Sequence, residues 1–392
     1  MSPIPEAQPL SPEAIAARFV EPGWIQAVQP LGNGQINDTF LVRLRPGAAA
    51  ALEGRGRFGE AFVLQRLNGA VFRDPAEVIA NHRVVEQHVN RHLREGVPAL
   101  AGRRWELPEL LPPRQEPGPA VVVAGDHWRA LRFIAGTRSL EVISGPEQAH
   151  QVGLGLGTFH RLIRDMPVDQ LTDTLEGFHI TPAYLARYDS VRQGVAAAGA
   201  ETSADGWRQQ RRWCEAFIEE RRTLVPVLEQ ARAQGLLPLR PIHGDPKVNN
   251  LLLDAHSGAA IALIDLDTVK PGLVHYDIGD CLRSGCNPLG EETTDFEAVR
   301  FDADLGAAIL SGYLSMARSF LTEPDWEALP VAPRLLAFEL GLRFYTDHLE
   351  GDVYFRTRHR RHNLDRALVQ FHLVASIEAQ QARLAAIVAE LR

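Results

Sequence analysis

The sequence predicts an α+β fold in two lobes, a small β-rich N-terminal lobe and a larger, mainly helical C-terminal lobe. Short apolar runs of strand length occupy most of the first third of the chain, and amphipathic spacing of helical period dominates the remainder. One segment of loops and short strands at 240–280 interrupts the helices. The length of 392 residues suits two domains, and we expect them to span 1–135 and 136–392.

Strands and one long helix are expected in the first lobe. Two apolar stretches within 24–45 flank a glycine-containing turn, and further apolar runs lie at 61–67, 121–125 and 127–136. From 74 to 94 the apolar spacing predicts a helix, with Asp74 as its N-cap and Pro75 in its first turn. The hinge between the lobes is expected at 136–138.

Amphipathic helices are expected throughout the second lobe. The spacing of apolar residues is helical at 146–165, 208–234, 303–322, 330–349 and 363–390. The order of elements is therefore strands with one helix, a hinge, and helices broken by a single insert.

The composition excludes several classes of protein. Hydrophobic residues make up 45% and charged residues 23%, as in soluble globular proteins. A net charge of −8 argues against a nucleic-acid partner, and no apolar run approaches the roughly 20 residues of a membrane helix. With three cysteines and no targeting segment, we expect a cytoplasmic protein, monomeric or homodimeric, without a membrane partner.

The insert carries the residues with the clearest chemistry. In PIHGDPKVNN, residues 241–250, His243, Asp245, Lys247 and Asn250 have the spacing of a protein-kinase catalytic loop. Such residues are usually turn formers or caps when they occur singly, so the prediction rests on the whole set. An apolar hairpin follows and ends at Asp265.

Phosphoryl transfer explains why these residue types are needed. Asp245 would orient the acceptor hydroxyl and accept its proton. Asn250 and Asp265 would hold Mg²⁺ on the nucleotide phosphates. Lys247 would offset charge on the moving phosphoryl group. Lysine occurs only at 247 and 270 in a chain that otherwise uses arginine, which favours a specific role for Lys247.

A glycine-containing segment in the first lobe suggests where the nucleotide binds. Glycines in a hairpin let backbone amides approach phosphates, although such a pattern alone is more often an ordinary turn. Glu86, on the helix that follows the third strand, is either a partner for the residue at position 65 of that strand or a solvated helix residue. We expect ATP to contact the glycine segment at Gly32, Asn33, Gly34, Asn37 and Thr39. The family resemblance given below implies further contacts on the third strand and the hinge, at Gln65, Arg66, Arg132, Phe133 and Ile134. Gln65 stands where kinases carry a lysine, and Arg66 should point to the other face of the strand.

These segments resemble the aminoglycoside phosphotransferase and choline kinase superfamily, and within it most closely the bacterial N-acetylhexosamine 1-kinases. The resemblance covers both lobes and implies a protein-kinase-like fold. It also implies transfer of the γ-phosphoryl group of ATP, with Mg²⁺, to the anomeric hydroxyl of N-acetylglucosamine or N-acetylgalactosamine. The matching segments are GNGQINDTF at 32–40, FVLQRLN at 62–68, HGDPKVNN at 243–250, IDLDTVKPGLVHYDIGD at 264–280 and RFYTDHLEGDVYF at 343–355.

The resemblance also implies roles for single residues. Asp245 matches the base of the family, Asn250 and Asp265 match its metal ligands, and Arg343 and Tyr354 match positions in the hexosamine pocket. Asp347 lies one helical turn after Arg343, so we expect it either in the same sugar site or in an ion pair with Arg343.

Two alternatives remain open. The loop contains HGD, as in aminoglycoside kinases, where the sugar kinases carry Asn, so a kinase for an aminoglycoside, an amino alcohol or another sugar is the main rival. The absence of lysine at Gln65 supports a silent nucleotide-binding scaffold, which the intact Asp245, Asn250 and Asp265 oppose. No A-P-E segment follows Asp265, which disfavours a protein kinase.

Overall fold

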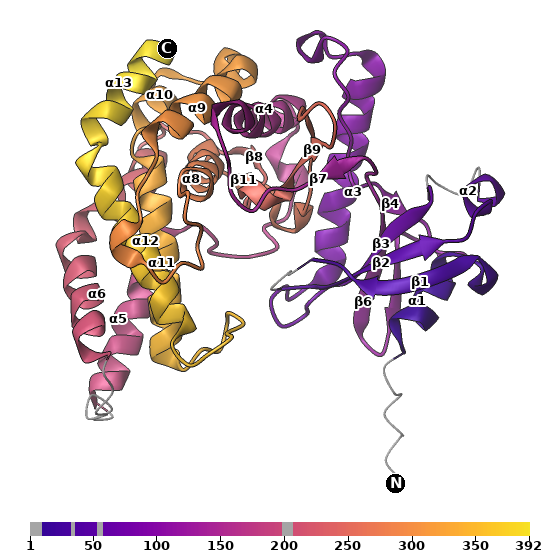
Figure 1. Ribbon diagram of the computed structural model, residues 1–392, viewed down its shortest axis with the longest axis horizontal. Helices are drawn as coiled ribbons and strands as arrows, with labels where there is room; N and C mark the ends of the chain where they lie inside the picture. Colours follow the sequence, from indigo (N-terminus) through magenta and orange to yellow (C-terminus); the bar gives the residue numbers. More distant parts are fainter. Residues whose placement is uncertain (1–9, 33–35, 53–57, 198–206) are drawn as a thin grey trace.

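The N-terminal lobe is built on a six-stranded antiparallel sheet, in a computed structural model that describes residues 10–32, 36–52, 58–197 and 207–392 (Figure 1). The strand order is β1-β2-β3-β6-β4, and β5 also pairs with β6. The strands are β1 (Ile25–Pro30), β2 (Asp38–Leu44), β3 (Ala61–Arg66), β4 (Leu110–Leu111), β5 (Ala120–Val123) and β6 (Asp126–Arg132). Two short helices, α1 (Pro12–Phe19) and α2 (Ala48–Ala51), accompany the sheet.

The two faces of this sheet have different surroundings. Because side chains alternate along a strand, Phe62 and Leu64 of β3 lie on the face that α1 covers, where they pack against Ile15. Gln65 lies on the opposite face, and the register pairs it with Arg129 of β6. That second face is directed towards the C-terminal lobe.

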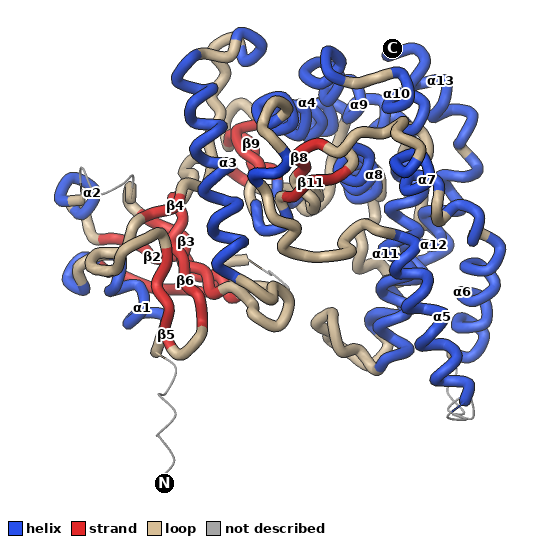
Figure 2. Tube along the Cα trace, turned by 180° about the vertical axis from the view of Figure 1, so that it is seen from behind, coloured by secondary structure: helices blue, strands red, loops and turns tan. Residues whose placement is uncertain are grey.

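Helix α3 (Pro75–Glu95) stands between the sheet and the helical lobe, as both views show (Figures 1 and 2). Its N-cap is Asp74, as predicted, whose side chain accepts a hydrogen bond from the N–H of Ala76 at 3.0 Å. Val78 packs in a small cluster of the first lobe, whereas Val85 belongs to the core of the second. The helix therefore contributes to both cores.

The C-terminal lobe is mainly helical and contains the largest hydrophobic core. At its centre α4 (Pro146–Ile163) and α9 (Ala303–Ala317) approach closely. A Cβ at Gly153 would lie 1.8 Å from the carbonyl oxygen of Ile309, so this approach requires glycine. In the described part of the chain, no helix is long and apolar enough to span a membrane. The helices are α4 (Pro146–Ile163), α5 (Thr181–Ala197), α6 (Arg208–Glu220), α7 (Val227–Ala233), α8 (Val274–Gly285), α9 (Ala303–Ala317), α10 (Glu323–Ala328), α11 (Ala332–Glu350), α12 (His362–Ala379) and α13 (Gln381–Leu391).

The predicted insert lies between α7 and α8 and forms two small antiparallel sheets. β9 (Leu251–Asp254) and β10 (Ala260–Leu263) form the predicted hairpin, which β7 (Thr137–Arg138) extends from the hinge. β8 (Arg240–Ile242) pairs with β11 (Lys270–Gly272). These pairings place the 243–250 loop beside the 264–268 turn.

The predicted fold class and order of elements are confirmed, but several helix limits differ. The helix expected at 208–234 is divided into α6 and α7, and the helix expected at 363–390 ends at Ala379 and resumes at Gln381. No limits were predicted for helix α8. Its residues are buried on nearly all sides, and this includes its polar residues at helical spacing, because Asp277 bonds to the 243–250 loop and Asp280 to Arg283.

Candidate active site

The 243–250 loop is held in place by helix α8. Asp277, in the first turn of that helix, accepts hydrogen bonds from the backbone N–H groups of His243 at 2.7 Å and Gly244 at 2.8 Å. Gly244 has a φ of +89°, and a Cβ there would lie 2.5 Å from the carbonyl oxygen of Thr268. Glycine therefore lets the loop lie directly against the 264–268 turn.

Hydrogen bonds join the loop to the turn. The imidazole Nε2 of His243 contacts the carbonyl oxygen of Ile264 at 2.9 Å, and the hydroxyl of Thr268 donates to the carbonyl oxygen of His243 at 2.9 Å. The N–H of Ile264 donates to the carbonyl oxygen of Asn250 at 2.9 Å. Asp265, which follows Ile264, is thereby brought next to the loop that carries Asn250.

The predicted acid, cation and amide of the loop lie together. The amino group of Lys247 donates to Asp245 Oδ2 at 2.7 Å, and the Asn250 side-chain N–H donates to the Asp245 carbonyl oxygen at 2.7 Å. Because the amide nitrogen of Asn250 is used within the loop, its amide oxygen is left for another ligand. Burial lowers the pKa of Lys247, but the carboxylates of Asp245 and Asp265 outweigh it, and the net shift is upward. Lys247 therefore remains a cation.

Asp265 occupies an unusual backbone position beside other carboxylates. Its φ is +67°, in the left-handed region that few residues other than glycine adopt. Burial, followed by the charges of Asp267 and Asp245, raises the pKa of Asp265 above its usual range, although Lys247 opposes the shift. A divalent cation would relieve this repulsion, and carboxylate and amide oxygens are the ligands that Mg²⁺ prefers.

Three predicted nucleotide ligands, Asn37, Thr39 and Gln65, belong to one hydrogen-bond network with Arg129 and Asp267. The Gln65 side-chain N–H donates to the hydroxyl of Thr39 at 3.1 Å, and its amide oxygen accepts from Arg129 at 2.8 Å. Arg129 forms a buried ion pair with Asp267, and Asn37 donates to the same carboxylate at 2.6 Å. The sequence analysis missed Arg129. The one available signal was a cation within the apolar run at 127–134, on the same face as Gln65.

On the acceptor side, a guanidinium group lies among aromatic rings. The Cζ of Arg343 is 5.0 Å from the ring centroid of Phe178, 5.1 Å from that of Tyr184 and 5.4 Å from that of Phe355. Among the residues that the structure describes, no carboxylate or other acceptor pairs with this guanidinium. Burial lowers the pKa of Arg343, but Tyr184, Tyr354 and the carboxylates of Glu339 and Asp245 outweigh burial, and the net shift is upward.

The comparison with known families decides the class of this site. Residues 27–318 match the model of the phosphotransferase enzyme family. The chain belongs to this family. The protein is therefore a phosphotransferase.

Solved structures of other phosphotransferases share the two-lobed, protein-kinase-like fold. The aminoglycoside phosphotransferase from Alicyclobacillus acidocaldarius is 17% identical, with a TM-score of 0.58 and 98% of each chain covered. The ethanolamine kinase of Plasmodium vivax is 13% identical, with a TM-score of 0.55, covering 91% of this chain and 85% of the other. A choline/ethanolamine kinase family protein from Mesorhizobium loti is 16% identical, with a TM-score of 0.52, covering 96% and 98%. At these identities the likeness concerns the fold alone.

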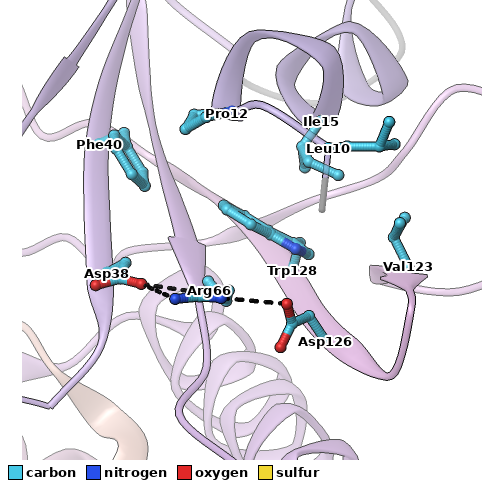
Figure 3. A pocket seen from close by; sticks show the side chains of 9 residues that line it. All are labelled: Leu10, Pro12, Ile15, Asp38, Phe40, Arg66, Val123, Asp126 and Trp128. Atoms are coloured by element: carbon cyan, nitrogen blue, oxygen red, sulfur yellow. Dashed lines mark hydrogen bonds and ion pairs between the residues drawn. The ribbon is translucent and has the colours of Figure 1, made fainter. Parts of the chain in front are cut away.

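Arg66 of this phosphotransferase does not face the cleft, which corrects its expected role as a nucleotide ligand. It lies on the outer face of the sheet, between Asp38 and Asp126 and beside Trp128, and lines a pocket together with Leu10, Pro12 and Ile15 (Figure 3). The pleat explains the difference, because Gln65 faces the C-terminal lobe and the next residue must face away.

The hinge residues are placed differently from one another. The guanidinium of Arg132 pairs with Glu106 and donates to the carbonyl oxygen of Leu107 at 3.1 Å. Phe133 is exposed, and Ile134 is buried in a small cluster with β10. Gly32 is described, with a φ of +72°, whereas the predicted ligands Asn33 and Gly34 lie outside the described residues.

Asp347 supports a loop and forms no ion pair with Arg343. Its carboxylate accepts hydrogen bonds from the backbone N–H groups of Val353 at 3.0 Å, Tyr354 at 2.8 Å and Phe355 at 3.0 Å. The side chain is buried and fully engaged. Asp347 was expected to contact the acceptor, but both of its carboxylate oxygens instead hold the 351–355 loop, which places Phe355 beside Arg343.

Proposed function

We propose that the protein transfers the γ-phosphoryl group of ATP to the anomeric hydroxyl of an N-acetylhexosamine, with Mg²⁺. The observation that carries the choice of acceptor is the unpaired guanidinium of Arg343 within its aromatic surround. The arrangement of Asp245, Asn250 and Asp265 described above supports the binding of a nucleotide together with Mg²⁺. Mg²⁺ held by Asn250 and Asp265 would neutralise charge on the β- and γ-phosphates.

In this proposal the residues of the 243–250 loop have separate roles. Asp245 orients the acceptor hydroxyl towards the γ-phosphorus and accepts its proton. Lys247, hydrogen-bonded to Asp245 at 2.7 Å, supplies a positive charge next to the transferred group. Asn250 fixes the backbone at Asp245 through its side-chain N–H. Most of the acceleration then comes from positioning and electrostatics.

Charge in the acceptor site favours a neutral acceptor that is rich in oxygen. A guanidinium presents planar N–H donors, which suit an acetamido carbonyl or sugar hydroxyls and repel an ammonium group. Glu339 is paired with His179 at 2.9 Å, and Asp280 is paired with Arg283 at 2.7 Å through Oδ1, while Asp280 Oδ2 is buried with no hydrogen-bond partner among the described residues. An aminoglycoside or amino alcohol would instead require unpaired carboxylates or an aromatic surface free of a resident cation.

The rival acceptors remain testable with one panel. Purified full-length protein would be supplied with MgATP and with N-acetylglucosamine, N-acetylgalactosamine, glucose, galactose, an aminoglycoside, choline and ethanolamine, and ADP release would be measured. We expect turnover with the N-acetylhexosamines and, by phosphorus NMR, a product phosphorylated at the anomeric oxygen. Turnover of an amino alcohol or aminoglycoside with no turnover of any sugar would reject the proposal.

Replacing Asp245 tests the phosphoryl-transfer role itself. Asp245→Asn removes the proton acceptor but keeps the shape, so kcat should fall about 10²- to 10⁴-fold with nucleotide affinity retained. Asp254→Asn, at the tip of the β9–β10 hairpin, is the matched control and should keep the wild-type rate. A near wild-type rate for Asp245→Asn would refute the assignment.

A further inference from the structure

Arg129 and Asp267 form a buried ion pair between the two lobes. Arg129 comes from β6 of the first lobe and is 0% exposed, while Asp267 comes from the 264–268 turn of the second and is 3% exposed. Asp267 lies two residues after Asp265. The pair therefore connects the sheet of the nucleotide lobe to the turn that carries the proposed metal carboxylate.

The guanidinium of Arg129 is restrained on every side. Its Nε and Nη2 donate to the Gln65 amide oxygen at 3.1 Å and 2.8 Å, and its Nη1 lies 3.4 Å from His82 Nδ1. His82 Nε2 contacts the carbonyl oxygen of Pro108 at 2.7 Å, and a carbonyl can only accept, so Nδ1 is the free acceptor for Arg129. Burial and the charge of Arg129 lower the pKa of His82 to about 3, which keeps the imidazole neutral.

The second oxygen of Asp267 reaches another part of the nucleotide lobe. Asn37 donates to Asp267 Oδ2 at 2.6 Å, and the Asn37 amide oxygen accepts from the backbone N–H of Asn68 at 3.0 Å. Asn37 directly precedes β2, at the end of the glycine-containing segment. One carboxylate thus joins the 264–268 turn to both β6 and the segment that precedes β2.

This arrangement differs from the usual kinase pairing of a third-strand lysine with a helix glutamate. Here the third strand carries Gln65, which orients Arg129, and Glu86 of α3 accepts the backbone N–H of Leu110 at 2.9 Å. Arg129 has no exposed surface with which to contact a phosphate. The cation is therefore directed at the 264–268 turn and not at the nucleotide.

We propose that Arg129 is a positioning residue for phosphoryl transfer, which acts through Asp267 to set the place of Asp265 relative to the nucleotide lobe. This role rests on the proposed function, in which Asp265 holds the metal. Loss of an outer partner of a metal ligand typically costs 10- to 100-fold in metal affinity. Weakening the pair should therefore raise the Mg²⁺ requirement and leave the acceptor site unaffected.

The test uses two variants that keep the site filled. Arg129→Lys keeps the charge but loses the planar fork that reaches Gln65 and Asp267 together, and Asp267→Asn keeps the size but loses the charge. Each should raise the Mg²⁺ concentration for half-maximal turnover, and the Mg²⁺-dependent Kd of ATP by calorimetry without acceptor, by about tenfold or more. The acceptor KM should not change. Asp126→Asn is the matched control, because Asp126 lies on the same strand but pairs with Arg66 on the outer face (Figure 3).

A double variant removes both buried charges, so that neither is left without its partner. The variant with both Arg129→Met and Asp267→Leu leaves no unpaired charge, so it should fold even where a single variant does not. Its increase in the Mg²⁺ concentration for half-maximal turnover should be no larger than that of the more affected single variant. Folded variants with wild-type Mg²⁺ dependence would overturn the positioning role. The calorimetric measurement needs no acceptor, so failure of the sugar assignment would appear separately, as a wild-type protein that binds MgATP but phosphorylates no sugar.

Discussion

The carboxylate of Asp277 accepts a hydrogen bond from the backbone N–H of Gly244 at 2.8 Å, one residue before Asp245. The same carboxylate accepts from the N–H of His243 and contacts His160 Nε2 at 2.8 Å. A single buried group therefore connects α4, α8 and the 243–250 loop. Its ionisation links the stability of the fold to the geometry of the catalytic loop.

Stability below neutral pH should depend on Asp277. Burial raises its pKa, but the hydrogen bond and charge of His160 outweigh burial, so the net shift is downward. A carboxylate with a folded pKa below its unfolded value stabilises the protein above about pH 4, and this contribution is lost as pH falls further. Asp277→Asn should lower the free energy of unfolding by about 1–3 kcal/mol at pH 7, and the difference should shrink in acid. Urea unfolding at several pH values measures this, with the exposed Asp304→Asn as control; a difference independent of pH would contradict the assignment.

Gly244 should tolerate no side chain. Gly244→Ala would place a methyl group 2.5 Å from the carbonyl oxygen of Thr268 and would strain a φ of +89°. Gly258→Ala has a similar φ of +73° in the β9–β10 turn but meets nothing within 4 Å. The control should cost about 1–2 kcal/mol of stability with full activity, because only backbone strain is added. Gly244→Ala should cost more and should also lower kcat; equal effects in thermal unfolding and turnover would show that the close approach does not matter.

Replacing Arg343 should weaken binding of the acceptor without weakening binding of ATP. Arg343→Met removes the donors while keeping an apolar stem among the rings, so the acceptor KM should rise about 10- to 100-fold, as expected for a lost hydrogen bond from a charged group. The KM for ATP should stay within about twofold, because Arg343 contacts only the acceptor in the proposed function. Arg334→Met, on the same helix but near Glu378, is the control. Equal increases in both KM values would indicate a structural role.

Asp347 should act on the acceptor through the 351–355 loop. Asp347→Asn replaces one carboxylate oxygen by an amide that cannot accept from the N–H of Phe355 or from Asn363, whose side-chain N–H donates to Asp347 at 2.9 Å. We expect a loss of about 1–3 kcal/mol in unfolding free energy and a raised acceptor KM, because buried donors lose their partner. Thermal unfolding and initial rates check both effects. A raised KM for ATP with an unchanged acceptor KM would contradict this account.

Local sequence patterns were sufficient for part of the site. Asp245, Lys247 and Asn250 lie within one short loop, so their spacing alone predicts that they meet. Asp265 follows through a hairpin whose two short apolar runs are also visible in the sequence. The pleat likewise predicted that Gln65 and Arg66 face opposite sides.

Long-range packing decided the remainder of the site. Arg129 and Asp267 are 138 residues apart, and Phe178 and Tyr184 belong to a region around α5 with no predicted element. The spacing of Arg343 and Asp347 correctly placed them one turn apart. It could not show that backbone N–H groups of the 351–355 loop would donate to the carboxylate of Asp347.

By itself the sequence determined the two-lobed order of elements and the contiguous catalytic loop, because hydrophobic periodicity and short motifs act over a few residues. Only the tertiary structure decided which cation meets Asp267, which backbone N–H groups donate to Asp347 and which rings surround Arg343. Those outcomes depend on strand register and on the packing of segments distant in the chain, where buried charges must find partners regardless of their separation in sequence.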